Sequence, residues 1–471
     1  MRRRVLFVLA VAAVALVAVP EAASAHGFVG REDLPIPKWL FGWAATVVLV
    51  ASFVGLAVLW PRPRLEQPAE RRVASLPRLL DPICAAIGLA GFALIVYAGF
   101  AGSQETTDNV VPTFVFVVFW VVIPVLSALL GDVFMAFNPW RAIARAAAAI
   151  ASRVSRGPLP AAMPYPTALG RWPAAAGILV FAWVELVYPG RAEPSHLAVL
   201  ALAYAAVQLV GYSLFGIDAW SRRGDAFGVY FGLFARMSPL RWEGGALYRR
   251  LALSGLTTLD AVPGTVALLC TMIGTTSFDG FQAGPLWGDL APRMSDALRN
   301  VGFSEATALQ VAFTIGLVVV VLLVAGLYRL GVSGMRNASR IGLSTDALAA
   351  RFAHTLVPIA LAYVVAHYFS LVAYQGQAMG YLVSDPLGRG ANVFGTAAQT
   401  IDYTWVTATT IWYVQVTALM FGHVAGLILA HDRALVAFKD GRAATRSQYW
   451  MLAVMIAFTS LGLWLLSAAG S

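Results

Sequence analysis

Charged residues are scarce in this sequence. Asp, Glu, Lys and Arg make up only 12% of its 471 residues, whereas soluble domains average about 25%. With 59% hydrophobic residues, such a chain must expose most of its surface to lipid or to other helices, which argues against an ordinary soluble domain. The formal net charge of +9 is carried by short segments beside hydrophobic runs, so we expect no nucleic-acid partner.

Cysteine and the common catalytic signatures are also nearly absent. The two cysteines, Cys84 and Cys270, both lie in apolar runs, and we interpret them as packing residues rather than a disulfide or a zinc site. The sequence contains no P-loop, no Gly-x-Ser-x-Gly and no His-Glu-x-x-His pattern. ATPase, serine hydrolase and zincin functions therefore have no support.

The N-terminus has the pattern of a secretory signal peptide. Three arginines, Arg2 to Arg4, precede an apolar run at 5–19, and Ala23-Ser24-Ala25 follows as a small-x-small cleavage pattern. We predict a signal peptide at 1–25 and one integral membrane domain at 26–471, with an uncleaved first span as the alternative. Cleavage would make His26 the mature N-terminus, where its amine and imidazole would chelate copper if a second histidine joined them; a solvated histidine is the alternative.

Ten further hydrophobic runs are each long enough to cross a hydrocarbon core of about 30 Å. They are 38–60, 82–102, 111–137, 166–188, 196–217, 257–277, 305–328, 352–375, 404–430 and 449–468. The predicted fold class is all-α: a polytopic helical membrane protein with about ten transmembrane helices after signal cleavage. In this prediction, 277–304 is a long loop.

Lys and Arg alternate strongly between the connecting segments. Five segments hold 24 of the 33 basic residues when Arg171 at the edge of the second is included: 61–81, 138–165, 218–256, 329–351 and 431–448. Because basic loops stay in the cytoplasm, we predict that these segments are cytoplasmic and that the mature N-terminus and the C-terminus are extracytoplasmic.

Two places in the sequence share the pattern Gly-Asp-x-Phe. Gly131-Asp132-Val133-Phe134 follows the third predicted span, and Gly224-Asp225-Ala226-Phe227 follows the fifth. The second lies in an aromatic, glycine-rich segment that is too short to span, so we expect it at the interface or re-entering the membrane. A shared pattern of only four positions indicates an internal repeat weakly.

Ionisable residues within apolar spans are costly and mark functional sites. Five of them are predicted at one depth near the cytoplasmic side: Asp132, Asp260, His354, His423 and His431. We predict a divalent metal ion held by His354 and His423, with the other three as further ligands or general base, where the metal would activate water for hydrolysis. Structural hydrogen bonds, a proton or substrate pathway and a single haem between His354 and His423 are the alternatives.

Two further ionisable residues, Glu185 and His367, are predicted near the extracytoplasmic side. His367 lies 13 residues beyond His354, roughly 20 Å along one helix, so these two histidines cannot bind one ion. We expect the polar and aromatic end of this span to line an outer vestibule or to form part of an interfacial aromatic belt.

Several motifs together resemble a known family. They are Ala25-His26-Gly27-Phe28-Val29-Gly30-Arg31 with Asp33-Leu34-Pro35-Ile36-Pro37, Gly131-Asp132 through Asn138-Pro139-Trp140, His354-Thr355-Leu356-Val357-Pro358 through His367-Tyr368, and Gly422-His423-Val424 through His431-Asp432-Arg433. The set resembles bacterial membrane proteins of the fenitrothion hydrolase family. The resemblance implies a hydrolase of the bacterial plasma membrane that acts on small lipophilic organophosphorus triesters, and it carries over no catalytic residues.

A function of a different class stays open. Ten spans, kinked helices and intramembrane His and Asp residues are also typical of a transporter of protons, metal ions or small lipophilic solutes. In that interpretation the same side chains bind and release protons during transport. The lipid bilayer is the partner that both interpretations share.

Overall fold

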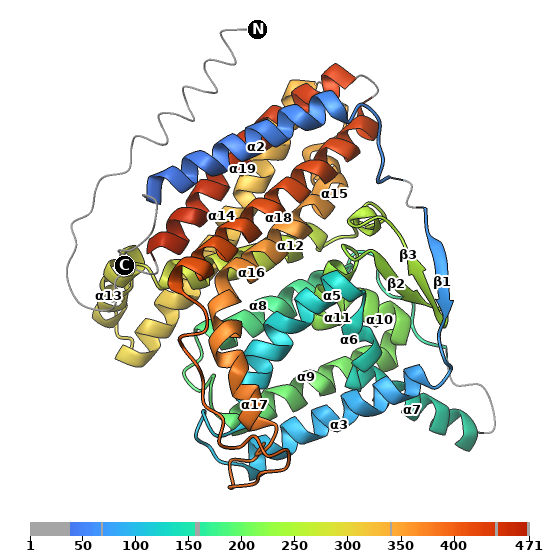
Figure 1. The fold of residues 1–471 in the computed structure, drawn as a ribbon, viewed down its shortest axis with the longest axis vertical. Helices are drawn as coiled ribbons and strands as arrows, with labels where there is room; N and C mark the ends of the chain where they lie inside the picture. The colour runs from blue at the N-terminus through green and yellow to red at the C-terminus, as the bar shows by residue number, and fades with distance from the viewer. Residues whose placement is uncertain (1–37, 67–68, 156–160, 340–341, 439–440, 469–471) are drawn as a thin grey trace.

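A computed structural model describes residues 38–66, 69–155, 161–339, 342–438 and 441–468. The predicted signal peptide and His26 lie outside the described residues. The described part of the chain is mostly helical, with 73% of its residues in helices. Long helices run side by side through the molecule, and a small β-sheet lies at one edge (Figure 1).

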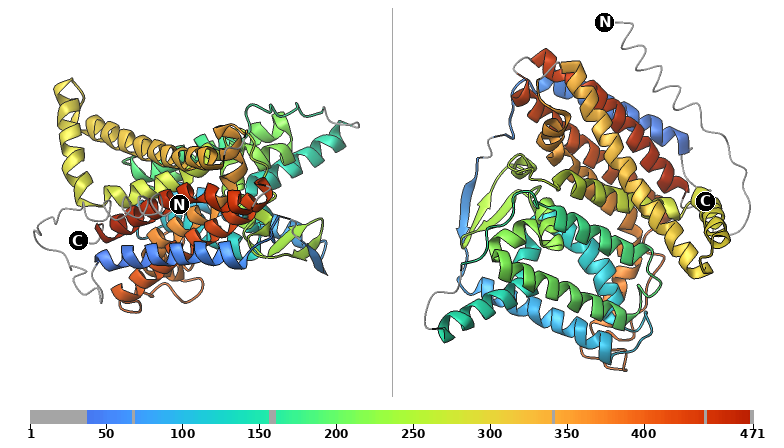
Figure 2. Two further views of the ribbon diagram at one scale, coloured as in Figure 1. Left: turned by 90° about the horizontal axis from the view of Figure 1, so that it is seen from above. Right: turned by 180° about the vertical axis from the view of Figure 1, so that it is seen from behind.

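The long elements are joined by short helices and turns. The helices are α2 (Lys38–Leu59), α3 (Leu80–Ala101), α4 (Val110–Thr113), a π-helix (Phe114–Val122), α5 (Ile123–Leu130), α6 (Val133–Phe137), α7 (Pro139–Val154), α8 (Trp172–Leu186), α9 (Pro194–Phe215), α10 (Ile217–Arg223), α11 (Ala226–Ala235), α12 (Thr265–Gln282), α13 (Pro285–Asn300), α14 (Glu305–Ser339), α15 (Thr345–Phe352), α16 (Leu356–Gln375), α17 (Met379–Leu382), α18 (Ala408–Ala437) and α19 (Gly441–Ala468). Short 3₁₀ turns lie at Ser254–Leu256, Ala353–Thr355 and Gly376–Ala378. In the view from behind, α14 and α19 lie side by side (Figure 2).

Seven helical segments among the described residues are long and apolar enough to cross a membrane. They are Gly42–Leu59, Leu80–Ala101, Val110–Leu130, Pro194–Phe215, Glu305–Ala338, Thr345–Leu382 and Ala408–Ala437. These segments indicate a helical membrane protein. The three other predicted spans correspond to α8, which has only 15 residues, to α12 and to α19, so the number ten stays a prediction.

A three-stranded antiparallel sheet joins two segments that are far apart in the sequence. Its strands are β1 (Arg71–Ser75), β2 (Leu240–Glu243) and β3 (Ala246–Arg249), in the order β1-β3-β2. Gly244 and Gly245 form the β2–β3 turn with φ of 58° and 71°, values that favour glycine. We call this end of the bundle the sheet end, and the end that carries the 383–407 loop the loop end.

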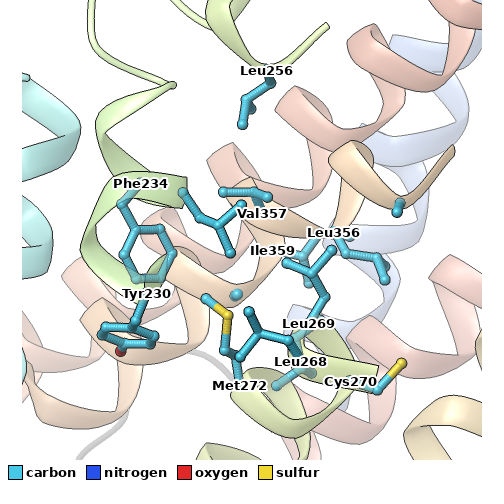
Figure 3. Close-up of a cluster of buried hydrophobic side chains, with 14 of the residues drawn as sticks. Tyr230, Phe234, Leu256, Leu268, Leu269, Cys270, Met272, Leu356, Val357 and Ile359 are labelled. Atoms are coloured by element: carbon cyan, nitrogen blue, oxygen red, sulfur yellow. The ribbon is translucent and has the colours of Figure 1, made fainter. Parts of the chain in front are cut away.

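The core lies where α11, α12 and α16 meet. Figure 3 shows Tyr230 and Phe234 of α11 beside Leu268 and Met272 of α12, with Val357 of α16 next to them. Nine of the ten residues of α11 are buried, so this segment lies inside the helix bundle. A helix that is apolar on every side is typical of a protein core or of a membrane, and α11 lies in the core.

Candidate functional site

The five residues of the predicted inner metal site do not form one cluster among the described residues. Asp132 caps α6, because its Oδ1 accepts a hydrogen bond from the Met135 N–H at 3.1 Å. Asp260 does not belong to a helix, since α12 begins only at Thr265; its side chain is exposed. The prediction that Asp260 lies in the first turn of a span was therefore wrong, because the chain reaches α12 through a turn at Gly264, which has a φ of 80°.

His431 and its neighbour Asp432 fasten α18 to the segment that follows α2. The Nε2–H of His431 donates to the Trp60 carbonyl at 3.1 Å, and its Nδ1 accepts from the Gln448 amide at 3.2 Å. Asp432 is fully buried and accepts from Trp60 Nε1 at 2.9 Å and from the backbone N–H groups of Arg64 and Leu65 at 2.7 and 2.9 Å. Both nitrogens of His431 are thus used in packing hydrogen bonds.

The two histidines predicted as metal ligands are buried between α16 and α18. His354 lies in the 3₁₀ turn before α16 and His423 lies within α18; they are 2% and 0% exposed. His423 donates from Nδ1 to the Leu419 carbonyl of its own helix at 2.7 Å. Within the described residues, the Nε2 atoms of both histidines have no hydrogen-bond partner.

No group of three or more His, Cys, Asp or Glu side chains within the described part of the chain is arranged to hold a metal ion. The divalent-metal site stays a prediction without geometric support from these residues.

A different acid–histidine cluster lies farther toward the loop end. His367 Nε2 of α16 is 2.8 Å from Asp279 Oδ2 of α12, and Gln282 donates to the other oxygen of Asp279 at 2.8 Å. Tyr368 of α16 donates to Glu185 Oε1 of α8 at 3.3 Å. We call Glu185, Asp279, His367 and Tyr368 the acid–histidine cluster.

Three helices therefore bring two carboxylates and an imidazole into one part of the bundle. The side chains of His367 and Asp279 are 20% and 18% exposed, so the pair is mostly, but not completely, shielded. Among the described residues, no lysine or arginine forms an ion pair with Asp279 or Glu185. Without such a cation, the negative charge inside an apolar bundle must be balanced by protons or by a bound cation.

Sequence reasoning named Glu185 and His367 but missed Asp279, which it placed in a loop. The structure continues α12 to Gln282 and then forms α13, so the prediction of a long loop at 277–304 was wrong. Hydroxyl side chains along α12 donate to carbonyls four residues earlier, as Thr271 does to Ala267 and Ser277 to Ile273. These bonds give the polar side chains hydrogen-bond partners within their own helix, so a fall in hydropathy does not by itself mark the end of α12.

The Gly-Asp-x-Phe pattern marks two helix starts. Asp225 caps α11 as Asp132 caps α6: its Oδ1 accepts from the Gly228 N–H at 3.0 Å. Asp225 is fully buried and accepts four further hydrogen bonds, from Tyr204 Oη at 2.7 Å, Tyr212 Oη at 2.8 Å, Asn138 Nδ2 at 3.1 Å and Trp140 Nε1 at 3.2 Å. The two motif regions thus meet at the carboxylate of Asp225. The sequence pattern indicated only a weak internal repeat and did not predict this contact.

Asp225 is a structural centre because all five of its partners are donors and both oxygens are used. The acid–histidine cluster instead keeps partial exposure and an uncompensated acid. Of the polar groups in the described bundle, it is the one best suited to exchange a proton or to bind a solute. Comparisons with protein-family models, with curated proteins and with solved structures found no match for this chain.

Proposed function

We propose that this protein is a proton-coupled membrane transporter of a small solute, in which the acid–histidine cluster carries the proton. The observation that supports this most directly is the 2.8 Å contact between His367 and Asp279 near a second acid, Glu185. Intramembrane carboxylates and histidines in proximity are the usual elements of proton relays.

The position of the cluster suits stepwise proton transfer. His367 lies eight residues before the end of α16, roughly 12 Å from it at 1.5 Å per residue. Asp279 lies only three residues before the end of α12. Glu185 lies only one residue before the end of α8, so a proton entering from the loop end would meet either acid before His367, and the Tyr368 hydroxyl connects this histidine's helix to Glu185.

Irregular helices around the cluster support a moving part. A π-helix at Phe114–Val122 interrupts the α4–α5 segment, and α11 is a short helix buried inside the bundle. Trp120 of the π-helix stacks on Tyr230 of α11 with ring centroids 4.9 Å apart. Interrupted helices near a buried polar site are a recurrent feature of secondary transporters.

The proposal includes the predicted topology of ten spans, a cleaved signal peptide and cytoplasmic basic segments. Contacts between three of the basic segments support it: Arg241 pairs with Glu70 at 2.6 Å, and Arg433 pairs with Glu66 at 2.6 Å. Since these three segments meet at the sheet end, the proposal assigns them to one side of the membrane. The proposed location is a bacterial plasma membrane with the sheet end in the cytoplasm.

The test is a pH-jump current on a solid-supported membrane with reconstituted protein. Divalent cations, small organic cations and a lipophilic phosphotriester serve as candidate solutes. We expect a protein-dependent current that Asp279→Asn and His367→Gln abolish and that Asp289→Asn retains, because Asp289 is an exposed residue of α13. A wild-type protein without current for any solute, or variants with wild-type currents, would refute proton coupling through this cluster.

A hydrolase is the second candidate, and the same pair favours it. An imidazole held by a carboxylate can act as a general base toward water, and a substrate dissolved in the bilayer would approach the partly exposed pair from the side. This proposal keeps the lipophilic phosphotriester as substrate but places the base at His367. Release of nitrophenol from a nitrophenyl phosphotriester that His367→Gln abolishes, without any pH-jump current, would favour hydrolysis over transport.

The divalent metal ion belongs to this second candidate. If His354 and His423 are metal ligands, elemental analysis of protein purified without chelator will give a near-stoichiometric divalent metal that His423→Ala removes. Protein without metal that still hydrolyses the triester would leave the acid–histidine cluster as the catalytic site.

A further inference from the structure

We propose that a groove between α2 and α18 binds one anionic phospholipid, with an acyl chain in the groove and the phosphate at Arg64. The groove has a volume of about 270 Å³ and is lined by Ser52, Gly55, Leu56, Leu59, Trp60, Val424 and Ile428. Both helices belong to the segments of membrane-spanning length, so the groove lies where lipid chains are the surrounding solvent.

Gly55 keeps the groove open. A Cβ built on Gly55 meets no atom within 4 Å, so helix packing does not explain the absence of a side chain there. Leu49 and Phe53 of α2 pack on Leu427 of α18 and form the buried contact that holds the helices together. The groove is therefore a fixed feature between two packed helices.

Arg64 lies at the sheet end of the groove. Its guanidinium carbon is 4.5 Å from the centre of the Trp60 ring, and its Nη2 is 3.4 Å from the Leu59 carbonyl. Both Trp60 and Leu59 line the groove. Asp432 accepts a hydrogen bond from Trp60 Nε1, so the aromatic ring beneath the Arg64 guanidinium is fixed in position.

The local charges favour an anionic ligand. Asp432 accepts three hydrogen bonds from residues 60 to 65, and Glu66 pairs with Arg433 at 2.6 Å. Among the described residues, Arg64 forms no ion pair with a carboxylate, and Arg62 beside it is exposed. Arg64 at the end of an apolar groove, with exposed Arg62 two residues before it in the sequence, fits a phosphate headgroup above an acyl chain.

Native mass spectrometry tests the proposal with added phosphatidylglycerol or phosphatidylcholine. We expect the wild type to retain one phosphatidylglycerol more tightly than phosphatidylcholine. Gly55→Leu fills the groove and should weaken retention of both lipids. Gly42→Leu is the matched control, because a Cβ there also meets no atom within 4 Å and it lies 13 residues away on the same helix, roughly 20 Å along its axis.

The headgroup is tested separately. Arg64→Gln leaves the backbone bond to Asp432 intact and should weaken phosphatidylglycerol retention about tenfold while sparing phosphatidylcholine. Arg78→Gln, an exposed arginine before α3, should change neither. Equal retention of the two lipids by the wild type would overturn the anionic assignment. If Gly55→Leu retained lipid as tightly as the wild type, the groove would not be the lipid site. The same would follow if the wild type formed a dimer without any lipid adduct and Gly55→Leu converted that dimer to a monomer.

Discussion

Replacing Asp225 by asparagine tests whether its five hydrogen bonds hold the inner part of the bundle together. Asparagine has nearly the same shape but offers one carbonyl oxygen and one NH₂ group. In the native protein, two donors bond to Oδ1 and three to Oδ2. Whichever way the amide turns, at least two donors lose their acceptor and face an N–H instead.

The magnitude follows from the number of lost bonds. A hydrogen bond to a charged group contributes about 1.5–3 kcal/mol, so two lost bonds correspond to about 3–6 kcal/mol. Tyrosine hydroxyls can turn to accept from the new NH₂ group, which recovers about 1 kcal/mol. We therefore expect Asp225→Asn to lower the free energy of unfolding by about 2–5 kcal/mol, a large part of the 5–15 kcal/mol typical of folded proteins.

The two buried cysteines supply the assay. Cys84 and Cys270 are free and buried, so a thiol-reactive fluorophore reports unfolding during a denaturant titration in mixed micelles. Asp218→Asn is the control, since Asp218 is exposed at the start of α10 and should change the midpoint little. An Asp225→Asn protein as stable as the control would refute the reasoning, because the five bonds would then add nothing beyond those made with water in the unfolded chain.

Two further predictions concern packing and pH. Gly422→Val should lower the free energy of unfolding by about 1–3 kcal/mol through overpacking, because a Cβ at Gly422 lies 2.8 Å from the Pro358 carbonyl oxygen. Gly91→Val is the control, since a Cβ there has no atom within 4 Å, and it should lower the free energy of unfolding far less in the same denaturant titration. Burial raises the pKa of Glu66 above its usual value, although Arg433 opposes this. The folded state therefore binds this proton more tightly, so the contribution of Glu66 to the free energy of unfolding falls as pH rises from about 4.5 to the raised pKa. Glu66→Gln should remove this contribution to the slope of the free energy of unfolding against pH. The same slope in the variant and the wild type would contradict the prediction.

The sequence determined the class of protein because hydrophobicity and charge act over whole segments. A run such as 82–102 is long enough to span and lacks charged residues, and it forms α3 at almost the same residues. Helices in lipid must satisfy their own backbone hydrogen bonds, so apolar runs of this length have one stable conformation. Exact ends were less predictable, since α12 continues to Gln282 although its hydropathy declines before that residue.

The candidate site depended on contacts between segments that are far apart in the sequence. His367 and Asp279 are 88 residues apart, and Asp225 meets Asn138 across 87 residues. Periodicity within one helix shows which residues share a face, but it does not show which neighbouring helix covers that face or at what depth. The sequence therefore determined a helical membrane protein with rare internal acids and histidines, whereas only the packing of α8, α12 and α16 decided which of them meet. Residues such as His431 and His423 looked equivalent to His367, and they differ because hydrogen bonds to Trp60, Gln448 and Leu419 occupy ring nitrogens of the first two.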